Sequence, residues 1–381
     1  MKSKLLGAVC IVVVAITLTL GLWPFHSPKN NVTWLKHTHG VAFGKYGTVL
    51  SSGALPAADF LTDTEVSVEI WAQPDRWNSS ATILALYRPE KGLLFTLNQS
   101  LTDLELQAEV QSRPDMMKGH FYVSEALGPA LRQRKQVFIT VTSGRRGTSV
   151  YLDGAPARVA PEFRIPDGAF RGRLIVGDSP RQPDSFRGQI RGLALYDSEL
   201  SGAQVLRHYQ AWVENGCPDA TQNERNVALY LFDEHSGNVV RNHSLINAAE
   251  AAGDLHIPET YEVIDKIALE PFWKEFNFSR GYWNGNFKNI IGFMPAGFCF
   301  FAYFTIARPV KRAVLITIFL GALVSLAIEV FQAHLPTRDS GTTDLITNIL
   351  GTYLGVLCYR IIYSQAAKRF PWVVKFAAPV A

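Results

Sequence analysis

The sequence predicts a multi-domain membrane protein that joins an all-β sandwich or jelly roll to an all-α transmembrane bundle of four spans. Only 18% of the 381 residues are charged, which is below the roughly 25% of an ordinary soluble domain. Four strongly apolar runs are long enough to cross a membrane. Between the first run and the second, short alternating segments bounded by Gly, Pro or Asp are typical of strands.

The four predicted spans are Leu5–Trp23, Ile290–Ala307, Ala313–His334 and Thr343–Tyr363. At about 1.5 Å per helical residue, each approaches the roughly 30 Å thickness of the hydrocarbon layer. We interpret the first run as an uncleaved anchor, because it is longer than the apolar core of a signal peptide. Trp23-Pro24-Phe25 also offers no small-residue cleavage site. Cleavage near Thr19-Leu20-Gly21 is the alternative.

Basic residues predict the orientation of these spans. Lys2 and Lys4 precede the first span, the loop Arg308–Arg312 joins the second to the third, and Lys368 and Arg369 follow the last. Since positive charge is retained on the cytoplasmic side, we expect both termini and this loop in the cytoplasm. The long segment between the first and second spans then lies outside.

That long segment is predicted to be a β domain with one helix. The predicted strands are Val66–Trp71, Val137–Val141, Ser149–Leu152, Leu174–Val176 and Ile190–Tyr196. Ser201 and Gln204 form a capping box, Val205 and Trp212 share one helical face with Tyr209, and Gly216 follows the end.

Charge and cysteine content exclude some classes of protein. The formal net charge is +4, with 37 Lys and Arg against 33 Asp and Glu, which is too weak a balance to indicate nucleic-acid binding. Of the four cysteines, Cys10, Cys299 and Cys358 lie in apolar runs. Cys217 alone remains in the β segment, so no disulfide framework is expected there.

Residues 41–200 resemble the laminin-G-like, concanavalin A-like jelly roll of bacterial surface proteins. The matching stretches are Val66–Pro74, Val150–Gly154, Phe186–Ile190 and Leu195-Tyr196. Leu229–Gly237 looks like the strand that normally opens this module, yet it comes last in this chain. A circular permutation would explain that order, because the ends of such a domain are usually adjacent.

Residues 286–364 resemble the VanZ-like membrane family, which takes its name from a glycopeptide (teicoplanin) resistance protein. The motifs are Asn289-x-x-Gly292-Phe293-x-Pro295-x-Gly297, Glu329-x-x-Gln332-x-x-Leu335-Pro336-x-Arg338 and Asp344-x-x-x-Asn348-x-x-Gly351-x-x-x-Gly355. The resemblance implies a bacterial cytoplasmic membrane protein, in which the jelly roll is inserted between the first and second spans. It does not imply a defined biochemical activity.

These observations predict five segments of the chain. They are an N-terminal transmembrane anchor (1–24), a laminin-G-like jelly roll (32–246), an aromatic-rich linker (247–286), a VanZ-like transmembrane domain (287–365) and a cytoplasmic tail (366–381). The linker is expected at the headgroup layer, because Trp and Tyr favour that depth. Packing of the linker on the β domain is the alternative.

Polar residues in the apolar segments predict a pocket. In the predicted topology, six of them converge at one depth near the outer leaflet: Asn289, Glu329, Gln332, Arg338, Asp344 and Asn348. Such residues indicate a functional site, because burying them in a membrane is unfavourable. The structural alternative pairs Glu329 with Arg338 and lets the others join helices. Gly292, Gly321, Gly351 and Gly355 are predicted helix-packing residues.

No catalytic residues are predicted, and we expect a binding protein rather than an enzyme. Glu329 and Asp344 could act as an acid and a base, but no nucleophile, metal cluster or phosphate loop accompanies them. In the jelly roll, Glu65 with Glu69 and Glu105 with Glu109 lack the intervening acid of a glycosidase strand.

No cofactor or metal site is expected either. His37 and His39 are interpreted as incidental, and no motif supports a structural calcium ion in the jelly roll.

We therefore expect a membrane protein that acts at the cell envelope, with an extracytoplasmic jelly roll that binds carbohydrate or protein. A role in glycopeptide resistance is included in this hypothesis. Expected partners are membrane lipids and a glycan, a lipid-linked cell-wall precursor or an envelope protein, but not nucleic acid. The alternatives are a membrane-embedded enzyme that acts on a lipid-linked substrate and an adhesion lectin that the spans merely anchor.

Overall fold

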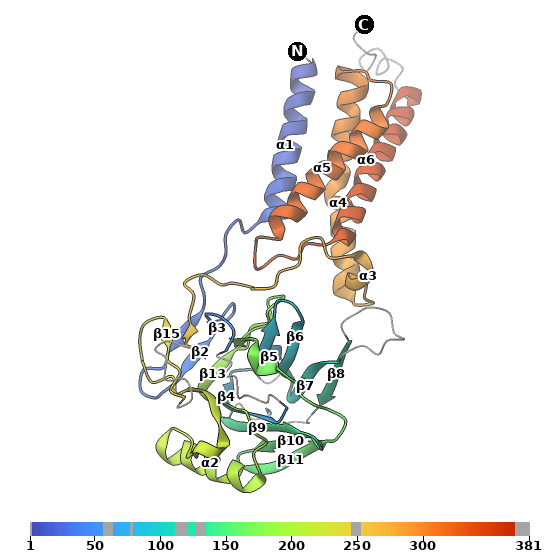
Figure 1. The fold of residues 1–381 in the computed structure, drawn as a ribbon. Helices are drawn as coiled ribbons and strands as arrows, with labels where there is room; N and C mark the ends of the chain where they lie inside the picture. The colour runs from blue at the N-terminus through green and yellow to red at the C-terminus, as the bar shows by residue number, and fades with distance from the viewer. Residues whose placement is uncertain are drawn as a thin grey trace. The chain divides into compact units, whose positions relative to one another are not determined.

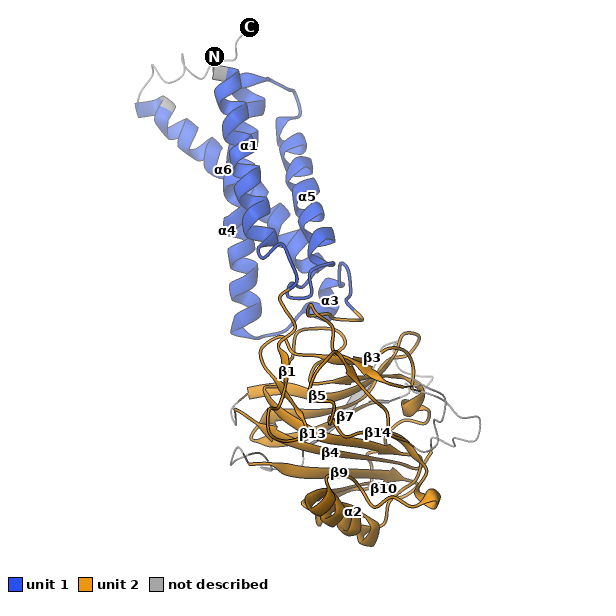
Figure 2. Ribbon diagram, turned by 90° about the vertical axis from the view of Figure 1, so that its left-hand side faces the viewer, with its two compact units in different colours: residues 1–27, 266–381 blue, residues 28–265 orange. Residues whose placement is uncertain are grey.

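A computed structural model of the chain describes residues 2–55, 64–76, 79–110, 121–126, 131, 135–244 and 253–369. The chain forms two compact units, which Figure 2 colours separately. The helical unit comprises Met1–Ser27 and Lys266–Ala381, and the β unit comprises Pro28–Asp265. The β unit is therefore inserted between the first helix and the remaining helices of the helical unit.

The helical unit contains four long helices (Figure 1). They are α1 (Lys2–Leu22), α4 (Arg280–Ala302, continued by the π-helical turn η3, Tyr303–Ala307), α5 (Ala313–Gln332) and α6 (Thr342–Arg369). A short helix, α3 (Phe272–Glu275), precedes α4. The stretches Ser3–Leu22, Arg280–Ala307, Ala313–Gln332 and Thr342–Ala366 are each long and apolar enough to cross a membrane. The predicted bundle of four spans is confirmed.

Glycines allow three of these helices to approach closely. A Cβ atom on Gly351 would lie 2.2 Å from a backbone oxygen of α4, and one on Gly355 would lie 2.1 Å from another. A Cβ atom on Gly321 would lie 2.4 Å from the Thr352 side chain. Such distances exclude any side chain, so these glycines pack α6 against α4 and α5. Gly292 does not fit the prediction, because a Cβ there would meet nothing within 4 Å. Gly292 instead lines the cavity of the helical unit that is described below, where the lack of a side chain leaves space.

The outer surface of the helical unit is apolar. Leu5 and Ile11 on α1 are exposed, as are Leu315 and Phe319 on α5 and Ile361 on α6. Exposed apolar side chains on helices of this length are suited to lipid contact rather than water.

The described part of the β unit forms two eight-stranded antiparallel sheets (Figure 1). The first has the order β1 (Val32–Trp34), β2 (Val41–Phe43), β13 (Gly188–Tyr196), β4 (Val66–Pro74), β9 (Val137–Gly144), β10 (Gly147–Leu152) and β11 (Ala155–Ala160), with β14 (Asn226–Tyr230) also paired to β13. The second has the order β15 (Val239–Val240), β16 (Leu255–His256), β3 (Val49–Ser51), β12 (Arg173–Val176), β5 (Ser79–Arg88), β6 (Gly92–Leu101), β7 (Asp103–Val110) and β8 (Phe121–Ala126). The predicted jelly-roll class is confirmed.

Period-two alternation places the core between the sheets. On β4, Val66, Val68 and Ile70 are buried in one apolar cluster with side chains of β5 such as Leu84 and Leu86. The opposite face of the first sheet is covered by α2 (Gly202–Asn215), whose Val205 and Trp212 pack on Phe138, Ala194 and Tyr196. The Ser201–Gln204 capping box and a left-handed Gly216 bound α2 as predicted.

The C-terminal segments complete both sheets. β14 pairs with Leu193–Tyr196 of β13, and β2 pairs with Gly188–Ile190 farther along the same strand. β16 pairs with β3 in the second sheet, so the compact unit continues to Asp265 rather than ending at residue 246. The first part of the expected linker therefore belongs to the β unit. The circular permutation remains a prediction.

Candidate functional site

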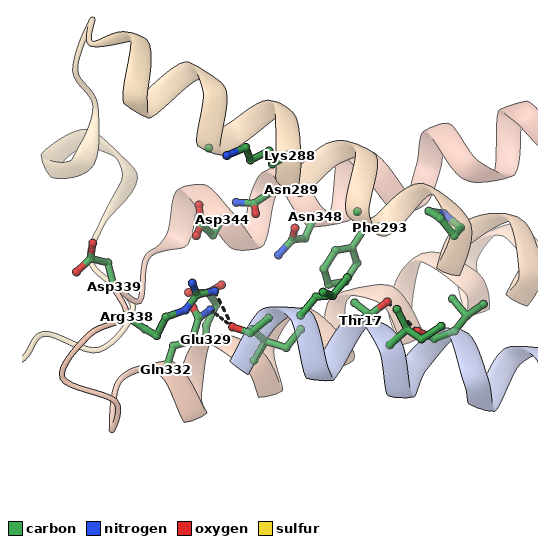
Figure 3. Close-up of a pocket in the computed structure, with 18 of the residues that line it drawn as sticks. Thr17, Lys288, Asn289, Phe293, Glu329, Gln332, Arg338, Asp339, Asp344 and Asn348 are labelled. Atoms are coloured by element: carbon green, nitrogen blue, oxygen red, sulfur yellow. Dashed lines mark hydrogen bonds between the residues drawn. The ribbon is translucent and has the colours of Figure 1, made fainter. Parts of the chain in front are cut away.

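The helical unit contains a partly open cavity of about 820 Å³. Its wall is built from α1, α4, α5, α6 and the loop between α5 and α6 (Figure 3). All six predicted pocket residues line it: Asn289, Glu329, Gln332, Arg338, Asp344 and Asn348. The structure thus brings together side chains that come from three separate motifs. Their role in ligand binding remains a proposal.

The cavity has one polar end and one apolar end. Its polar residues form two walls in Figure 3, with Glu329, Gln332 and Arg338 on one side and Asn289, Asp344 and Asn348 on the other. The apolar end is lined by Val13, Ile16, Leu20, Phe293 and Ile328. A cavity of this form suits an amphiphilic molecule better than a polar metabolite.

Glu329 accepts hydrogen bonds from a backbone amide and a serine hydroxyl rather than from a basic side chain. It is 1% exposed, and its Oε2 accepts a hydrogen bond of 2.9 Å from the Gly341 amide. Its carbonyl oxygen accepts a second bond, of 2.7 Å, from the Ser340 hydroxyl. Among the described ion pairs, none joins Glu329 to Arg338, so the pairing of the structural alternative is wrong. The carboxylate instead fixes the loop that leads into α6.

Arg338 and Gln332 both bind the C-terminal end of α1. Arg338 Nη2 and Gln332 Nε2 each donate to the Gly21 carbonyl oxygen at 2.7 Å. Because the last carbonyls of a helix carry partial negative charge and lack partners within the helix, a guanidinium group there is favourable. The N-terminal helix is therefore part of the cavity wall and not only an anchor.

The cavity is lined by three residues with a buried side-chain oxygen that has no hydrogen-bond partner, namely Thr337, Asn348 and Gln332, and the last two offer amide oxygens that can only accept. Asn348 is 3% exposed; its Nδ2 donates to Ser325 Oγ at 2.9 Å, but its Oδ1 is unpaired. Gln332 is 5% exposed, and its Oε1 is also unpaired. Leaving a buried polar atom unpaired costs about 1–3 kcal/mol. Both residues line the cavity, so a ligand with hydrogen-bond donors would satisfy them.

The chain segment that precedes α4 clamps the α5–α6 loop. Lys266 donates to the carbonyl oxygens of Leu335 and Arg338, and burial lowers the pKa of Lys266 to about 8. Farther along, Glu275 Oε2 accepts a 2.9 Å bond from the Thr343 amide in the first turn of α6. A carboxylate at a helix N-terminus is favourable. These contacts hold Arg338 in position at the cavity.

Sequence reasoning missed several lining residues. Lys288 and Asp339 line the cavity, and so do Thr17 and Gly21 of α1. Lys288 adjoins the predicted Asn289, so its charge beside a span could have indicated it. No sequence signal pointed to Gly21, because its contribution is a backbone carbonyl group.

In the β unit, a buried polar cluster holds α2 on the sheet. Glu69 is 0% exposed and accepts hydrogen bonds from Tyr196 Oη at 2.9 Å and Trp212 Nε1 at 3.2 Å. His208 Nδ1 lies 2.9 Å from Glu69, and its Nε2 lies 3.3 Å from Glu224. Because α2 covers Glu69, this carboxylate cannot face a glycan, and the cluster has a structural role.

One group of three side chains in the described residues could hold a metal ion. Donor atoms of Asp233, Glu234 and His243 all lie within 4.8 Å of one another. Calcium prefers six to eight oxygen ligands, and this group offers two carboxylates and an imidazole. It therefore does not fit the calcium ion considered for the jelly roll. His37 and His39 are exposed and belong to no such group among the described residues.

Comparisons with known proteins agree with the two-unit architecture. Residues 47–206 match the family model of the concanavalin A-like lectin/glucanases superfamily, and residues 229–363 match that of VanZ/LLP1. The VanZ/LLP1 match begins in β14 and so includes the last strands of the β unit. A search of curated proteins finds no match.

Solved structures with a similar fold are distant. They include a protein from Bacteroides ovatus ATCC 8483 described as carbohydrate binding (12% identity, TM-score 0.37, 61% of this chain and 63% of that chain). A SAP-like pentraxin from Limulus polyphemus is 13% identical (TM-score 0.34, 62% of this chain and 97% of that chain). The ligand-binding domain of botulinum neurotoxin serotype D, solved with N-acetylneuraminic acid, is 15% identical (TM-score 0.33, 50% and 48%).

The match covers less than two thirds of the Bacteroides ovatus protein, and scores this low carry no argument about a ligand. The chain thus joins a region that matches the VanZ/LLP1 family model to a region that matches the model of the concanavalin A-like lectin/glucanases superfamily.

Proposed function

We propose that this protein is a multi-pass membrane protein of the bacterial cell envelope whose helical unit binds an amphiphile with a hydroxyl- or amide-rich headgroup. The observation that carries the proposal is the pair of buried, unpaired oxygens of Gln332 and Asn348 at the polar end of the cavity. A headgroup hydroxyl or amide donates to such oxygens, whereas a bare phosphate or carboxylate ion cannot.

Charge favours a neutral or zwitterionic headgroup over a strongly anionic one. Lys288 and Arg338 bring positive charge to the cavity, and Glu329, Asp339 and Asp344 bring negative charge. The three carboxylates outnumber the two cations, and Arg338 also donates to the Gly21 carbonyl oxygen, so the described lining differs from the clusters of cations that bind phosphate. A sugar-bearing lipid with a neutral headgroup has the chemistry that fits.

The apolar end of the cavity would hold the lipid chain. Val13, Ile16 and Leu20 of α1 face this space together with Phe293 and Ile328. Burial of apolar surface contributes about 25 cal/mol per Å², so a chain in contact with these residues would supply much of the affinity. The headgroup contacts would supply specificity.

A variant of Asn348 tests this proposal. Asn348→Leu removes the unpaired oxygen, and Leu350→Ala, at an exposed position of α6, serves as control. The full chain is purified in mild detergent, and its retained lipids are identified by native mass spectrometry. We expect one sugar-bearing lipid class to be retained by the wild type and Leu350→Ala but lost from Asn348→Leu. Equal retention by a folded Asn348→Leu protein would refute the proposal.

We further infer the orientation that the basic loops predict, with both termini cytoplasmic and the β unit outside. Cys217 is partly buried near the end of α2, while the other three cysteines lie in membrane spans. A membrane-impermeant thiol reagent should therefore label Cys217 in spheroplasts, with Cys217→Ser as control. Labelling that requires lysis of the cytoplasmic membrane would contradict this orientation.

In this orientation, the β unit would bind a glycan or a protein of the envelope. The superfamily of lectins and glucanases to which residues 47–206 are matched supports a carbohydrate ligand. A changed teicoplanin sensitivity of a deletion strain, restored by the intact gene, would support a role in resistance; unchanged sensitivity would count against it.

A membrane-embedded enzyme is the second candidate function. Glu329 and Asp344 line the same cavity and could transfer protons to and from a bound lipid-linked substrate. Turnover of such a lipid by the purified protein, abolished by Asp344→Asn, would favour it. In a third arrangement, an anchored adhesion lectin, replacement of the four helices by an unrelated anchor would leave function intact.

A further inference from the structure

A second hollow, of about 240 Å³, lies at one end of the sandwich in the β unit. Three loops form it. Lys45 and Tyr46 follow β2, Arg76 follows β4, and Asp184 and Arg187 lie in the loop between β12 and β13. The volume is below the roughly 300–1,000 Å³ of sites for drug-sized ligands, so it suits a single small unit such as one sugar ring.

The hollow carries excess positive charge. Lys45, Arg76 and Arg187 line it, and none of them forms an ion pair within 4.0 Å among the described residues. The one carboxylate present, on Asp184, already accepts a hydrogen bond of 2.9 Å from the Thr82 hydroxyl. Burial also raises the pKa of Asp184 above its usual value, which favours its neutral form. The three cations therefore lack a balancing anion.

The β12–β13 loop is held rigid by a buried carboxylate. Asp178 is completely buried, and its Oδ1 accepts bonds of 2.8 Å from the amides of Ser179 and Asp184. Its Oδ2 accepts a bond of 3.2 Å from the Ser185 hydroxyl. A loop that is fixed before binding loses little conformational entropy when a ligand arrives.

Backbone hydrogen bonds bring the cations together. The Asp75 amide donates to the Arg187 carbonyl oxygen at 2.9 Å, which ties the loop that carries Arg76 to the β12–β13 loop. The Arg76 carbonyl oxygen in turn accepts from Gln99 Nε2 at 2.6 Å. The Lys45 ammonium lies 4.5 Å from the centroid of the Tyr46 ring. Both arginine side chains thus project from fixed backbone.

We propose that this hollow binds an anionic sugar unit of an envelope polymer, with Arg76, Arg187 and Lys45 contacting its carboxylate or phosphate group. The hydroxyls of Ser79, Ser80 and Ser185 would bind the sugar hydroxyls. Arginine suits carboxylate and phosphate because its planar fork donates two parallel hydrogen bonds. This inference rests on the proposed function in naming a glycan as ligand, and it specifies the charge and place of that glycan.

The test measures binding of defined ligands to the full chain in lipid nanodiscs. Immobilised protein is titrated with polygalacturonate, with phosphorylated dextran and with neutral dextran. In a competition assay, a sugar phosphate is compared with inorganic phosphate. The two polyanions distinguish carboxylate from phosphate as the recognised group. We expect one polyanion to bind at least tenfold more tightly than dextran, and its affinity to fall with added salt.

Three variants locate the site. The double variant Arg76→Gln/Arg187→Gln should weaken binding of the polyanion at least tenfold. Ser80→Glu should also weaken it at least tenfold, because it adds a negative charge at an exposed position. Arg145→Gln, which removes one exposed positive charge in the β9–β10 turn, should leave binding unchanged. Circular dichroism of each variant checks that the β unit is folded.

The outcomes separate this inference from the proposed function. Equal weakening by Arg145→Gln, dextran binding as tight as polyanion binding, or inorganic phosphate competing as well as sugar phosphate would each overturn the anionic-sugar site. Dextran binding that persists in the double variant would leave a glycan-binding β unit standing. Failure of every glycan to bind the wild type would refute the glycan function itself.

Discussion

Glu329→Gln separates a ligand-binding role of this carboxylate from a purely structural one. Glu329 is almost completely buried, and its Oε2 accepts from the Gly341 amide at 2.9 Å. The nearby Arg338 donates instead to the Gly21 carbonyl oxygen. Removing the charge therefore strands no ion-pair partner, and a glutamine has the same shape and one amide oxygen.

The expected change in stability follows from the hydrogen bonds that remain. A hydrogen bond to a charged group contributes about 1.5–3 kcal/mol, and one between neutral groups about 0.5–1.5 kcal/mol. Glutamine keeps the neutral bond to Gly341 and also avoids burial of a charge, which is unfavourable. These effects oppose each other, so we expect the free energy of unfolding to change by no more than about 1 kcal/mol. Glu329→Ala would leave the Gly341 amide unpaired and cost about 1–3 kcal/mol.

The assay compares thermal unfolding in detergent, retained lipid and complementation of a deletion strain that is challenged with envelope-acting antibiotics. We expect Glu329→Gln to stay folded and membrane-inserted but to lose the lipid and the phenotype. Glu262→Gln removes one negative charge from an exposed residue that does not line the cavity, and it is the matched control. A stable Glu329→Gln protein that complements fully would refute the reasoning, because the carboxylate charge would then be dispensable.

Two further predictions test how each unit is held together. Burial alone would lower the pKa of His208, but its hydrogen bond with Glu69 and the charges of Glu69 and Glu224 outweigh this and raise it. The resulting stabilisation of α2 is present below the unfolded pKa of about 6.5 and is lost as pH rises through the higher folded value. The protection factors of the α2 amides in the full chain, which correct hydrogen exchange for its intrinsic dependence on pH, should therefore fall from pH 6 to pH 9 in the wild type. His208→Leu should remove that fall; an identical fall in both proteins would contradict the prediction. Gly355→Ala should destabilise the helical unit by about 1–3 kcal/mol in thermal unfolding, because its Cβ would overlap the backbone of α4. The control Gly292→Ala should not destabilise it, because a Cβ there has open space. Equal effects of the two variants would count against close packing at Gly355.

Local sequence patterns sufficed for the elements of this protein and for much of its candidate site. Apolar runs predicted the four spans, alternation predicted strands such as β4, and Ser201 with Gly216 predicted both ends of α2. The six polar residues of the cavity were also found, because residues three or four apart on a helix share one face. Glu329 and Asn348 could thus be assigned to one depth without knowledge of any contact.

Tertiary structure decided which groups actually meet. Arg338 binds Gly21, which is 317 residues away, and Lys266 binds the loop that carries Arg338. Burial of Glu69 beneath α2 also follows from a contact across 139 residues, with His208. A periodic pattern reports the face on which a residue lies, not its partner, because a hydrogen bond depends on where distant segments are folded in space. The partner of Arg338, the contribution of α1 to the cavity and the basic hollow between three loops therefore appeared only in the folded chain.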